Sequence, residues 1–248
     1  MFTRQLFRSI PLRATPVIRP QFARFISFAQ ADQPRIRIGS TAPNFQVDTT
    51  KGKIDFHEFI GNDWVILFSH PADFTPICTT ELGAFSRLKG EFDKRGVKLI
   101  GLSTEGVDSH NAWVKDIEEV ETQGKEFAFP IIADLNKEVA FKYDMVTEED
   151  FKNLKSGMVA TVRSVFIIDP KKTIRLTLTY PASTGRSTTE ILRVVDALQT
   201  SDKHGVATPV DWTPGQEVVI PPSVSDADAK AKFGEFRTVK PYLRYTKV

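Results

Sequence analysis

The chain has 248 residues, of which 41% are hydrophobic and 26% are charged, with a formal net charge of +2. These values are ordinary for a globular domain, and no apolar run approaches the ~20 residues that a membrane-spanning helix needs. A single cysteine cannot form an intrachain disulfide, which excludes the small secreted scaffolds that depend on disulfides.

The first segment, residues 1–31, contains five arginines and no aspartate, glutamate or lysine. Without these five positive charges the formal charge changes from +2 to −3, so the remainder gives no strong reason to expect nucleic-acid binding. Arginine-rich, acid-free composition with scattered apolar residues is typical of a mitochondrial transit peptide. We predict a cleaved presequence and a location in the mitochondrial matrix. A basic arm that stays attached is the alternative.

The central part of the chain alternates between strand-like and helix-like patterns. An opening loop at residues 38–45 and a hairpin signal at 51–53 come first. We predict strands at 64–69, 97–103, 129–133, 164–168 and 173–180, and helices at 79–94, 108–121, 137–143 and 188–198. This order indicates an α/β fold with a mixed central sheet flanked by helices. A thioredoxin-like domain over residues 36–204 fits this pattern.

The last segment, residues 205–248, differs in character from the domain before it. Its first half contains Pro209, Pro214, Pro221 and Pro222 around one short apolar run, so regular structure is interrupted repeatedly. We interpret it as a small C-terminal extension that packs on a partner subunit.

The only cysteine, Cys78, lies between the apolar strand pattern that ends near residue 69 and the helix pattern that starts near residue 79. This places it in or just before the first turn of a helix, where unpaired backbone N–H groups and the helix dipole favour an anion. A thiolate at such a position is a good nucleophile. The alternative is a small buried hydrophobe, which is the common role of a solitary cysteine.

The residues around Cys78 suggest a family. The pattern Pro71-x-x-x-Thr75-x-x-Cys78, with His70 before it and Glu81 after it, resembles the active-site signature of the peroxiredoxins. The lone cysteine and the C-terminal extension resemble the 1-Cys (peroxiredoxin-6 type) subfamily in its mitochondrial form. The resemblance covers about residue 37 to the C-terminus. It implies a thioredoxin-like fold, a thiol peroxidase without a prosthetic cofactor, and a homodimer with the extension at its interface.

The resemblance also implies roles for individual residues. Cys78 is the catalytic thiol that reduces hydrogen peroxide or alkyl hydroperoxides and becomes a sulfenic acid. The Thr75 hydroxyl is expected to engage the thiolate or the peroxide, and Pro71 to shape the loop and shield the sulfur. Arg163 is expected to stabilise the thiolate and orient an oxygen atom. For Thr75 the alternative is a helix cap, and for Arg163 a surface ion pair.

Three further residues are expected to support this site. Arg186 corresponds to a second arginine of the family, Glu81 is expected to pair with and orient both arginines, and His70 is expected beside the same pocket. A surface ion pair is the alternative for Arg186, and a hydrogen-bonded scaffold for His70. The other histidines are expected to be structural or exposed; they are His57, His110 and His204.

The absence of a second cysteine means that the thiol that resolves the sulfenic acid must come from another molecule. Glutathione with a glutaredoxin, or a thioredoxin system, is the expected reductant and partner. The waiting sulfenic acid is also expected to be open to overoxidation.

The sequence departs from some relatives that carry a lipase-like Gly-x-Ser-x-Gly stretch before the peroxidase motif. Here residues 61–65 place Asp63 where the serine would stand and Val65 where the last glycine would stand. His57 is kept, but Lys171 occupies the position of the acid. Without a hydroxyl or thiol nucleophile we expect no phospholipase activity at this site.

Other functional classes find less support. A dithiol oxidoreductase needs Cys-x-x-Cys, and Thr75 occupies the place of its first cysteine. A cysteine hydrolase with His70 as base stays open but has no supporting motif, and one cysteine with dispersed histidines lacks zinc-ligand spacing, so we expect no metal site. A holdase or redox-signalling adaptor is a further alternative.

Overall fold

The computed structural model describes residues 33–34, 36–154 and 159–248. The arginine-rich segment 1–31, with its predicted processing, lies outside the described residues. Among the described residues, no helix has both the length and the apolar character required to cross a bilayer.

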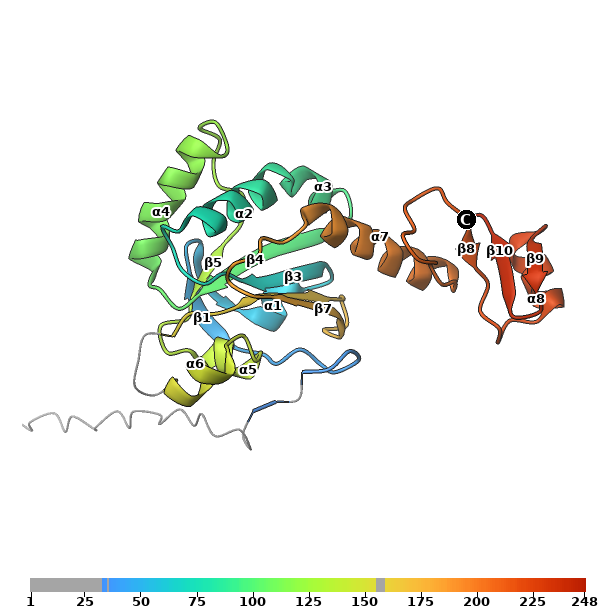
Figure 1. Cartoon of the computed structure of the whole chain (residues 1–248), viewed down its shortest axis with the longest axis horizontal. Coiled ribbons are helices and arrows are strands. Elements are labelled where there is room, and N and C mark those ends of the chain that lie inside the picture. Colours follow the sequence, from blue (N-terminus) through green and yellow to red (C-terminus); the bar gives the residue numbers. More distant parts are fainter. Residues whose placement is uncertain (1–32, 35, 155–158) are drawn as a thin grey trace, which may run out of the picture.

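A seven-stranded mixed sheet forms the centre of the molecule (Figure 1). Its order is β2-β1-β5-β4-β3-β6-β7; β3 pairs in parallel with β4 and β4 with β5, and the other neighbours are antiparallel. The predicted mixed sheet is confirmed. The strands are β1 (Gln46–Thr49), β2 (Gly52–Asp55), β3 (Trp64–Ser69), β4 (Val97–Ser103), β5 (Ile131–Ala133), β6 (Arg163–Ile168) and β7 (Ile174–Tyr180).

Helices cover both faces of this sheet (Figure 1). One face packs against α2, α3, α4 and α7, and the other against α1 and α5. The helices are α1 (Phe56–Ile60), α2 (Pro76–Arg87), α3 (Lys89–Asp93), α4 (Val107–Val120), α5 (Glu138–Lys142), α6 (Glu148–Asn153) and α7 (Thr188–His204).

The central strand β3 shows why the sheet needs both layers. Ile66 and Phe68 belong to the core under α2, α4 and α7, whereas Val65 and Leu67 belong to the core on the opposite face. All four side chains are fully buried. Because successive strand residues point to opposite faces, a continuous apolar run requires cover on both sides. This arrangement fixes the end of β3, where the loop to Cys78 begins.

Several predicted elements have different boundaries, and two of the differences concern a helix and a strand near the centre of the chain. The helix predicted over residues 79–94 is two helices, because the chain changes direction at Leu88 between α2 and α3. It also begins earlier, at Pro76, whose fixed φ and missing N–H suit the first position of a helix. The strand predicted from residue 129 begins only at Ile131, after Pro130, which has no N–H for the strand ladder.

The C-terminal extension contains more regular structure than the sequence suggested. It holds β8 (Val218–Val219), α8 (Asp226–Phe233), β9 (Arg237–Lys240) and β10 (Leu243–Thr246), with the strands in a sheet of order β8-β10-β9. These strands have two to four residues each, and β9 is exposed along its whole length, so they give no clear sequence pattern.

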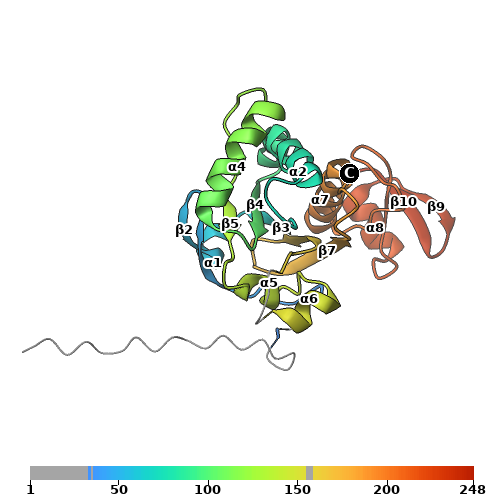
Figure 2. The same cartoon turned by 60° about the vertical axis from the view of Figure 1, so that its left-hand side comes forward.

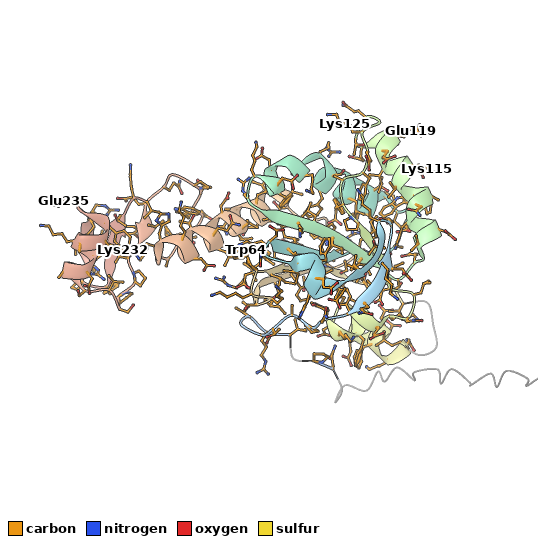
Figure 3. The ribbon with its side chains drawn as sticks, turned by 180° about the vertical axis from the view of Figure 1, so that it is seen from behind. Trp64, Lys115, Glu119, Lys125, Lys232 and Glu235 are labelled. Carbon is orange, nitrogen blue, oxygen red and sulfur yellow. The ribbon has the colours of Figure 1, made fainter. Side chains whose placement is uncertain are left out.

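The extension sits beyond the end of α7, away from the central sheet (Figures 1 and 2). In Figure 3, Lys232 and Glu235 mark the extension at one end of the molecule, and Lys115 and Glu119 on α4 lie at the other. Helix α7 continues past the predicted residue 198 to His204, and Gly205, whose φ of 62° suits a glycine, caps it. A small core joins the extension to α7; it consists of Ala197, Val206, Trp212 and Val218.

Candidate active site

Cys78 lies in the first turn of α2, as predicted. Thr75 is the extended N-cap residue and Pro76 begins the helix, so Cys78 is its third residue. Its side chain is fully buried against the core that α2 shares with β3 and α4. The first-turn backbone N–H groups and the helix dipole place positive potential at this sulfur.

Arg163 provides the cation nearest to this sulfur. It is the first residue of β6, is 2% exposed, and its Nη1 lies 3.4 Å from the Cys78 Sγ. Its Nε and Nη2 both donate to the Ala182 carbonyl, at 3.1 and 2.7 Å. These bonds hold the guanidinium plane in one orientation, with its charge fixed beside the sulfur. The surface ion pair that was the alternative for Arg163 is not what the structure shows.

Glu81 joins the two predicted arginines, as expected. Its Oε2 accepts from Arg163 Nη1 at 2.7 Å and from Arg186 Nη2 at 2.7 Å. Its Oε1 accepts from the backbone N–H of Arg186 at 2.7 Å and from Nε at 3.0 Å. Burial opposes ionisation, but the hydrogen bonds and charge of Arg186 and the charge of Arg163 outweigh it and hold the pKa of Glu81 below its ordinary value. The carboxylate is therefore ionised at neutral pH.

Arg186 anchors this cluster to the sheet. Its Nη1 donates to the carbonyls of Ser69 at 2.8 Å and Ser164 at 3.2 Å, which belong to β3 and β6. Its guanidinium also lies 5.1 Å from the centre of the Phe68 ring. Arg186 thus binds Glu81, and Glu81 in turn binds Arg163.

Thr75 and Pro71 lie in the loop between β3 and α2, and both are half-buried. The Thr75 hydroxyl donates to the Ala72 carbonyl at 2.9 Å and makes no side-chain bond to the helix N-terminus. Its proton is therefore committed, and its oxygen remains available only as an acceptor. In this arrangement Thr75 can receive a hydrogen bond from a peroxide O–H group but does not donate one to the thiolate.

His70 lies fully buried at the end of β3. Its Nε2 is 3.0 Å from Asp73 Oδ1, and its ring lies 5.0 Å from that of Trp113. Burial lowers the pKa of His70, and the Asp73 hydrogen bond opposes this only in part, so the ring is neutral at physiological pH. Asp73 and Trp113 hold the imidazole in place.

Asp73, close to His70, was missed at the level of sequence, whereas His110 was expected to be structural or exposed and is buried. Asp73 is buried and also contacts His110, whose Nδ1 lies 2.7 Å from Asp73 Oδ2. Among the described residues, ligand-type atoms of His70, Asp73 and Glu105 also lie within 4.8 Å of one another, but hydrogen bonds already connect them. The position of Asp73 inside the motif was the available signal, whereas nothing in the sequence linked it to His110, 37 residues further on.

The lipase-like stretch forms no catalytic constellation. Asp63 makes an ion pair with Lys98 at 2.9 Å, and both side chains are more than one-third exposed. His57 Nε2 contacts the Ala42 carbonyl at 2.7 Å. These contacts account for the polar groups of Asp63 and His57 without a nucleophile or a charge relay.

Sequence comparisons identify the family of this chain. The AhpC/TSA family matches residues 38–177, and the C-terminal domain of 1-Cys peroxiredoxin matches residues 197–235. The mitochondrial peroxiredoxin PRX1 of Saccharomyces cerevisiae is 61% identical over 220 residues, covering 89% of this chain and 84% of the relative. Peroxiredoxin-6 of Gallus gallus is 48% identical, covering 86% of this chain and 98% of the relative.

Solved structures agree with the sequence comparisons. A yeast mitochondrial 1-Cys peroxiredoxin, studied for thiol resolution via glutathione/thioredoxin systems, superposes with a TM-score of 0.80 at 60% identity, covering 86% of this chain and all of the other. A cysteine-to-serine mutant of peroxiredoxin 6 from Arenicola marina gives a TM-score of 0.81 at 45% identity, covering 86% and 98%. With a buried thiol beside a fixed arginine at a helix N-terminus, the chain belongs to the peroxiredoxin family, in its 1-Cys subfamily, and is a thiol peroxidase.

Proposed function

We propose that Cys78 is the peroxidatic thiol and that Arg163, Thr75 and Pro71 form the catalytic site around it. The observation that carries this proposal is the 3.4 Å contact between Arg163 Nη1 and the buried Cys78 Sγ in the first turn of α2. Glu81 and Arg186 hold that arginine in place. A fixed cation that needs no rearrangement during reaction stabilises charge more effectively than mobile water does.

The chemistry follows from this arrangement. The Cys78 thiolate attacks the terminal oxygen of a hydroperoxide, the S–O bond forms as the O–O bond breaks, and the departing oxygen leaves as water or an alcohol after it takes up a proton. Arg163 is placed to stabilise negative charge on the sulfur before attack and on the departing oxygen afterwards. The Thr75 oxygen accepts a hydrogen bond from the peroxide and helps to align it.

The second half of the cycle needs an external thiol, because the chain contains no second cysteine. The thiol attacks the sulfenic sulfur, releases water and forms a mixed disulfide, which a second thiol then reduces. Since Cys78 is fully buried and a thiol reductant is larger than hydrogen peroxide, this attack requires the first turn of α2 to open. Glutathione with a glutaredoxin, or a thioredoxin system, is the proposed reductant, in keeping with the systems studied for the yeast relative.

The proposal also covers where the protein is located and how it assembles. The mitochondrial yeast relative and the composition of residues 1–31 support import into the mitochondrial matrix. We assign residues 36–204 to the peroxidase domain and 205–248 to the extension. A homodimer is supported by β7, which forms an edge of the central sheet, and by the extension, which lies apart from that sheet.

The decisive experiment measures peroxide consumption by the mature protein and by Cys78→Ser, with glutathione plus glutaredoxin or with thioredoxin as the only reductant. We expect turnover by the wild type with at least one system and none by Cys78→Ser. Dimedone should label the peroxide-treated wild type at Cys78 alone. Full turnover by Cys78→Ser would disprove the assignment, and chaperone activity that survives in this variant would be a separate property.

A further inference from the structure

The first turn of α2, residues 76–80, is connected to helix α4 through the side chain of Thr79, the residue after Cys78. The indole N–H of Trp113 on α4 donates to the Thr79 hydroxyl at 3.1 Å, and this hydroxyl lies 2.9 Å from the Thr75 carbonyl. An indole nitrogen only donates and a carbonyl oxygen only accepts, so the hydroxyl proton points to Thr75. A chain of hydrogen bonds therefore runs from Trp113 through Thr79 to the N-cap residue of α2.

The two ends of this chain have different surroundings. Trp113 is 1% exposed and belongs to the core that α2 and α4 share with the sheet. Thr75 is half-buried in the loop before α2, and its own hydroxyl donates to the Ala72 carbonyl at 2.9 Å. Thr79 thus ties the loop around Thr75 to a side chain that is fixed in the core.

The helix N-terminus is otherwise weakly held on its outer side. Thr75 makes no side-chain capping bond, and Pro76 has no N–H group to donate. The side chains of Pro76 and Thr80 are exposed. Phe74 is 56% exposed and has a φ of 53°, in the left-handed region that a bulky residue adopts only at a cost in free energy. These features lower the free energy needed to open the first turn.

The next turn of α2 is held more firmly. Glu81 forms buried ion pairs with Arg163 and Arg186, and Leu82 is fully buried in the core. Local unfolding takes place where few buried contacts resist it. The boundary at Glu81 therefore allows residues 76–80 to open while the rest of α2 stays in place. Cys78 lies inside the segment that opens.

The sulfenic acid that forms on Cys78 has two fates, which differ in the space that they need. An external thiol attacks the sulfur, the S–O bond breaks, a disulfide forms and the oxygen leaves as water. A second peroxide instead transfers an oxygen atom to the sulfur, which gives the sulfinic acid and releases water or an alcohol. The peroxide is as small as the first one and reacts in the closed turn, whereas the larger thiol cannot reach the fully buried sulfur until the turn opens.

We propose that Thr79 and Trp113 are positioning residues, whose hydrogen bond holds the first turn of α2 closed and so sets how the sulfenic acid is divided between an external thiol and a second peroxide. This inference rests on the function proposed above. Loss of the bond opens the turn more often, which accelerates reduction by the thiol and lowers the share of sulfinic acid. A general loss of stability would not change the two reactions in opposite directions.

Access to the reduced sulfur provides the first test, and it does not depend on peroxidase activity. The bulky reagent dithionitrobenzoate reacts with Cys78, the only cysteine, and releases a coloured thiolate. Thr79→Val keeps the branched shape and removes the hydroxyl. We expect it to react about fivefold faster than the wild type, which is the effect of one hydrogen bond of average strength. Trp113→Phe keeps an aromatic ring without the N–H group and should react faster by a similar factor.

Thr80→Val is the matched control. Its hydroxyl donates to the Ile77 carbonyl of its own turn instead of forming a link to α4. Its modification rate should stay within about twofold of the wild type, because such local bonds contribute little to helix stability. The double variant Thr79→Val/Trp113→Phe should react no faster than the faster single variant, since the same hydrogen bond is lost only once.

The dependence of the modification rate on urea separates local opening from global unfolding. Opening of one turn exposes little surface, so the rate in low urea should rise only slightly in the wild type and in Thr79→Val. A rise as steep as that of the global unfolding transition would show that the reagent reaches Cys78 through global unfolding, and the proposal would be wrong.

The second test measures how the sulfenic acid is divided. The mature protein is treated with a series of hydrogen peroxide concentrations in the presence of glutathione, and mass spectrometry gives the amounts of sulfinic acid and glutathione mixed disulfide at Cys78. In Thr79→Val we expect half-conversion to sulfinic acid to need about fivefold more peroxide than in the wild type. The rate constant of the first peroxide reaction should stay within about threefold, because the closed turn remains the main state. Thr80→Val should behave as the wild type.

The outcomes separate this inference from the proposed function. Unchanged modification rates in Thr79→Val and Trp113→Phe would refute the closing role of the hydrogen bond, and faster modification with an unchanged product ratio would refute its effect on the two fates. Both results leave the peroxidase assignment intact, which Cys78→Ser tests. An active Cys78→Ser would refute that assignment, while the modification rates would still decide whether the bond closes the turn. If Thr79→Val fails to fold, Trp113→Phe decides.

Discussion

Two buried carboxylates near Cys78 each lie between two basic side chains, but the chemistry of those side chains differs. Glu81 lies between two arginines that follow it by 82 and 105 residues, and Asp73 lies between two histidines, His70 and His110. Arginine stays charged at every physiological pH, whereas histidine gains or loses its proton near neutrality. The first cluster therefore keeps its charge at every physiological pH, whereas the second contains side chains of a type that can gain or lose a proton.

The fixed charges of the two clusters differ as well. Two guanidinium groups and one carboxylate leave the Glu81 cluster with one positive charge, and Arg163 of this cluster contacts the Cys78 sulfur. The side-chain hydrogen-bond partners of Asp73 include no arginine or lysine; they are His70, His110 and Ser109. Two similar buried carboxylates therefore do different work, because their positions and their partners differ.

The largest expected effect follows from removing the charge of Glu81. Glu81→Gln leaves two buried guanidinium groups without their anion, and breaking a buried ion pair in this way costs about 3–5 kcal/mol. Urea unfolding monitored by circular dichroism should show this loss. The partly exposed pair of Glu190 and Arg193 provides the control, and Glu190→Gln should change stability by less than about 1 kcal/mol. Similar small losses in both variants would show that the Glu81 cluster contributes no more than a surface pair.

Replacing the guanidinium group of Arg163 tests directly how much its fixed charge and geometry contribute. Arg163→Lys keeps the charge but cannot bind Glu81 and the Ala182 carbonyl while it faces the sulfur. We expect the rate constant for peroxide reduction to fall about a hundredfold, as for the loss of a positioned donor in other enzymes. The control is Arg175, which pairs with Asp202 instead of with Glu81. We expect Arg175→Lys to leave the rate unchanged. An unaltered rate in Arg163→Lys would mean that charge alone suffices.

Stability as a function of pH should separate the clusters. The pKa of buried His70 lies below its ordinary 6.5, so the unfolded chain binds a proton that the native chain does not, and stability falls as pH drops below about 6.5. The pKa of Glu81 lies below its ordinary 4.5, so its contribution is complete above about 4.5 and is lost below it. Each group gives a slope of at most about 1.4 kcal/mol per pH unit.

Two variants test whether these two pH ranges belong to His70 and Glu81. In His70→Gln the unfolding free energy should vary less between pH 6.5 and 4.5, and in Glu81→Gln it should vary less below 4.5. Denaturant midpoints at intervals of half a pH unit give the measurement. A flattening of both windows by either variant would show that the clusters titrate together rather than separately.

The smallest expected effect concerns the exposed ion pair of Asp63 and Lys98, which serves as the reference for the buried ones. Asp63→Ala should change the free energy of unfolding by less than about 1 kcal/mol, because water already screens this pair. Peroxide reduction should be unchanged, and neither the wild type nor the variant should hydrolyse phospholipid. Hydrolysis by the wild type that disappears in Asp63→Ala would show that the lipase-like stretch is active after all.

Local sequence patterns were sufficient for much of the fold. The apolar run of β3, the spacing in α7 and the turn before β7 indicated an alternating α/β order, because periodicity records which side of each element is buried. The motif around Cys78 also located the thiol at a helix N-terminus. The patterns did not reveal the break at Leu88 or the strands of the extension, since these depend on a change of direction and on very short segments.

The sequence by itself determined that one thiol, in one motif, would carry the chemistry, and the resemblance named the residues expected around it. Only the tertiary structure decided which cation contacts the sulfur, how Glu81 fixes it, and that Asp73 binds His110 across 37 residues. The physical reason is that these contacts join side chains from different strands, loops and helices. Their free energies depend on burial and on geometry to within tenths of an ångström, neither of which is encoded in the spacing of residues along the chain.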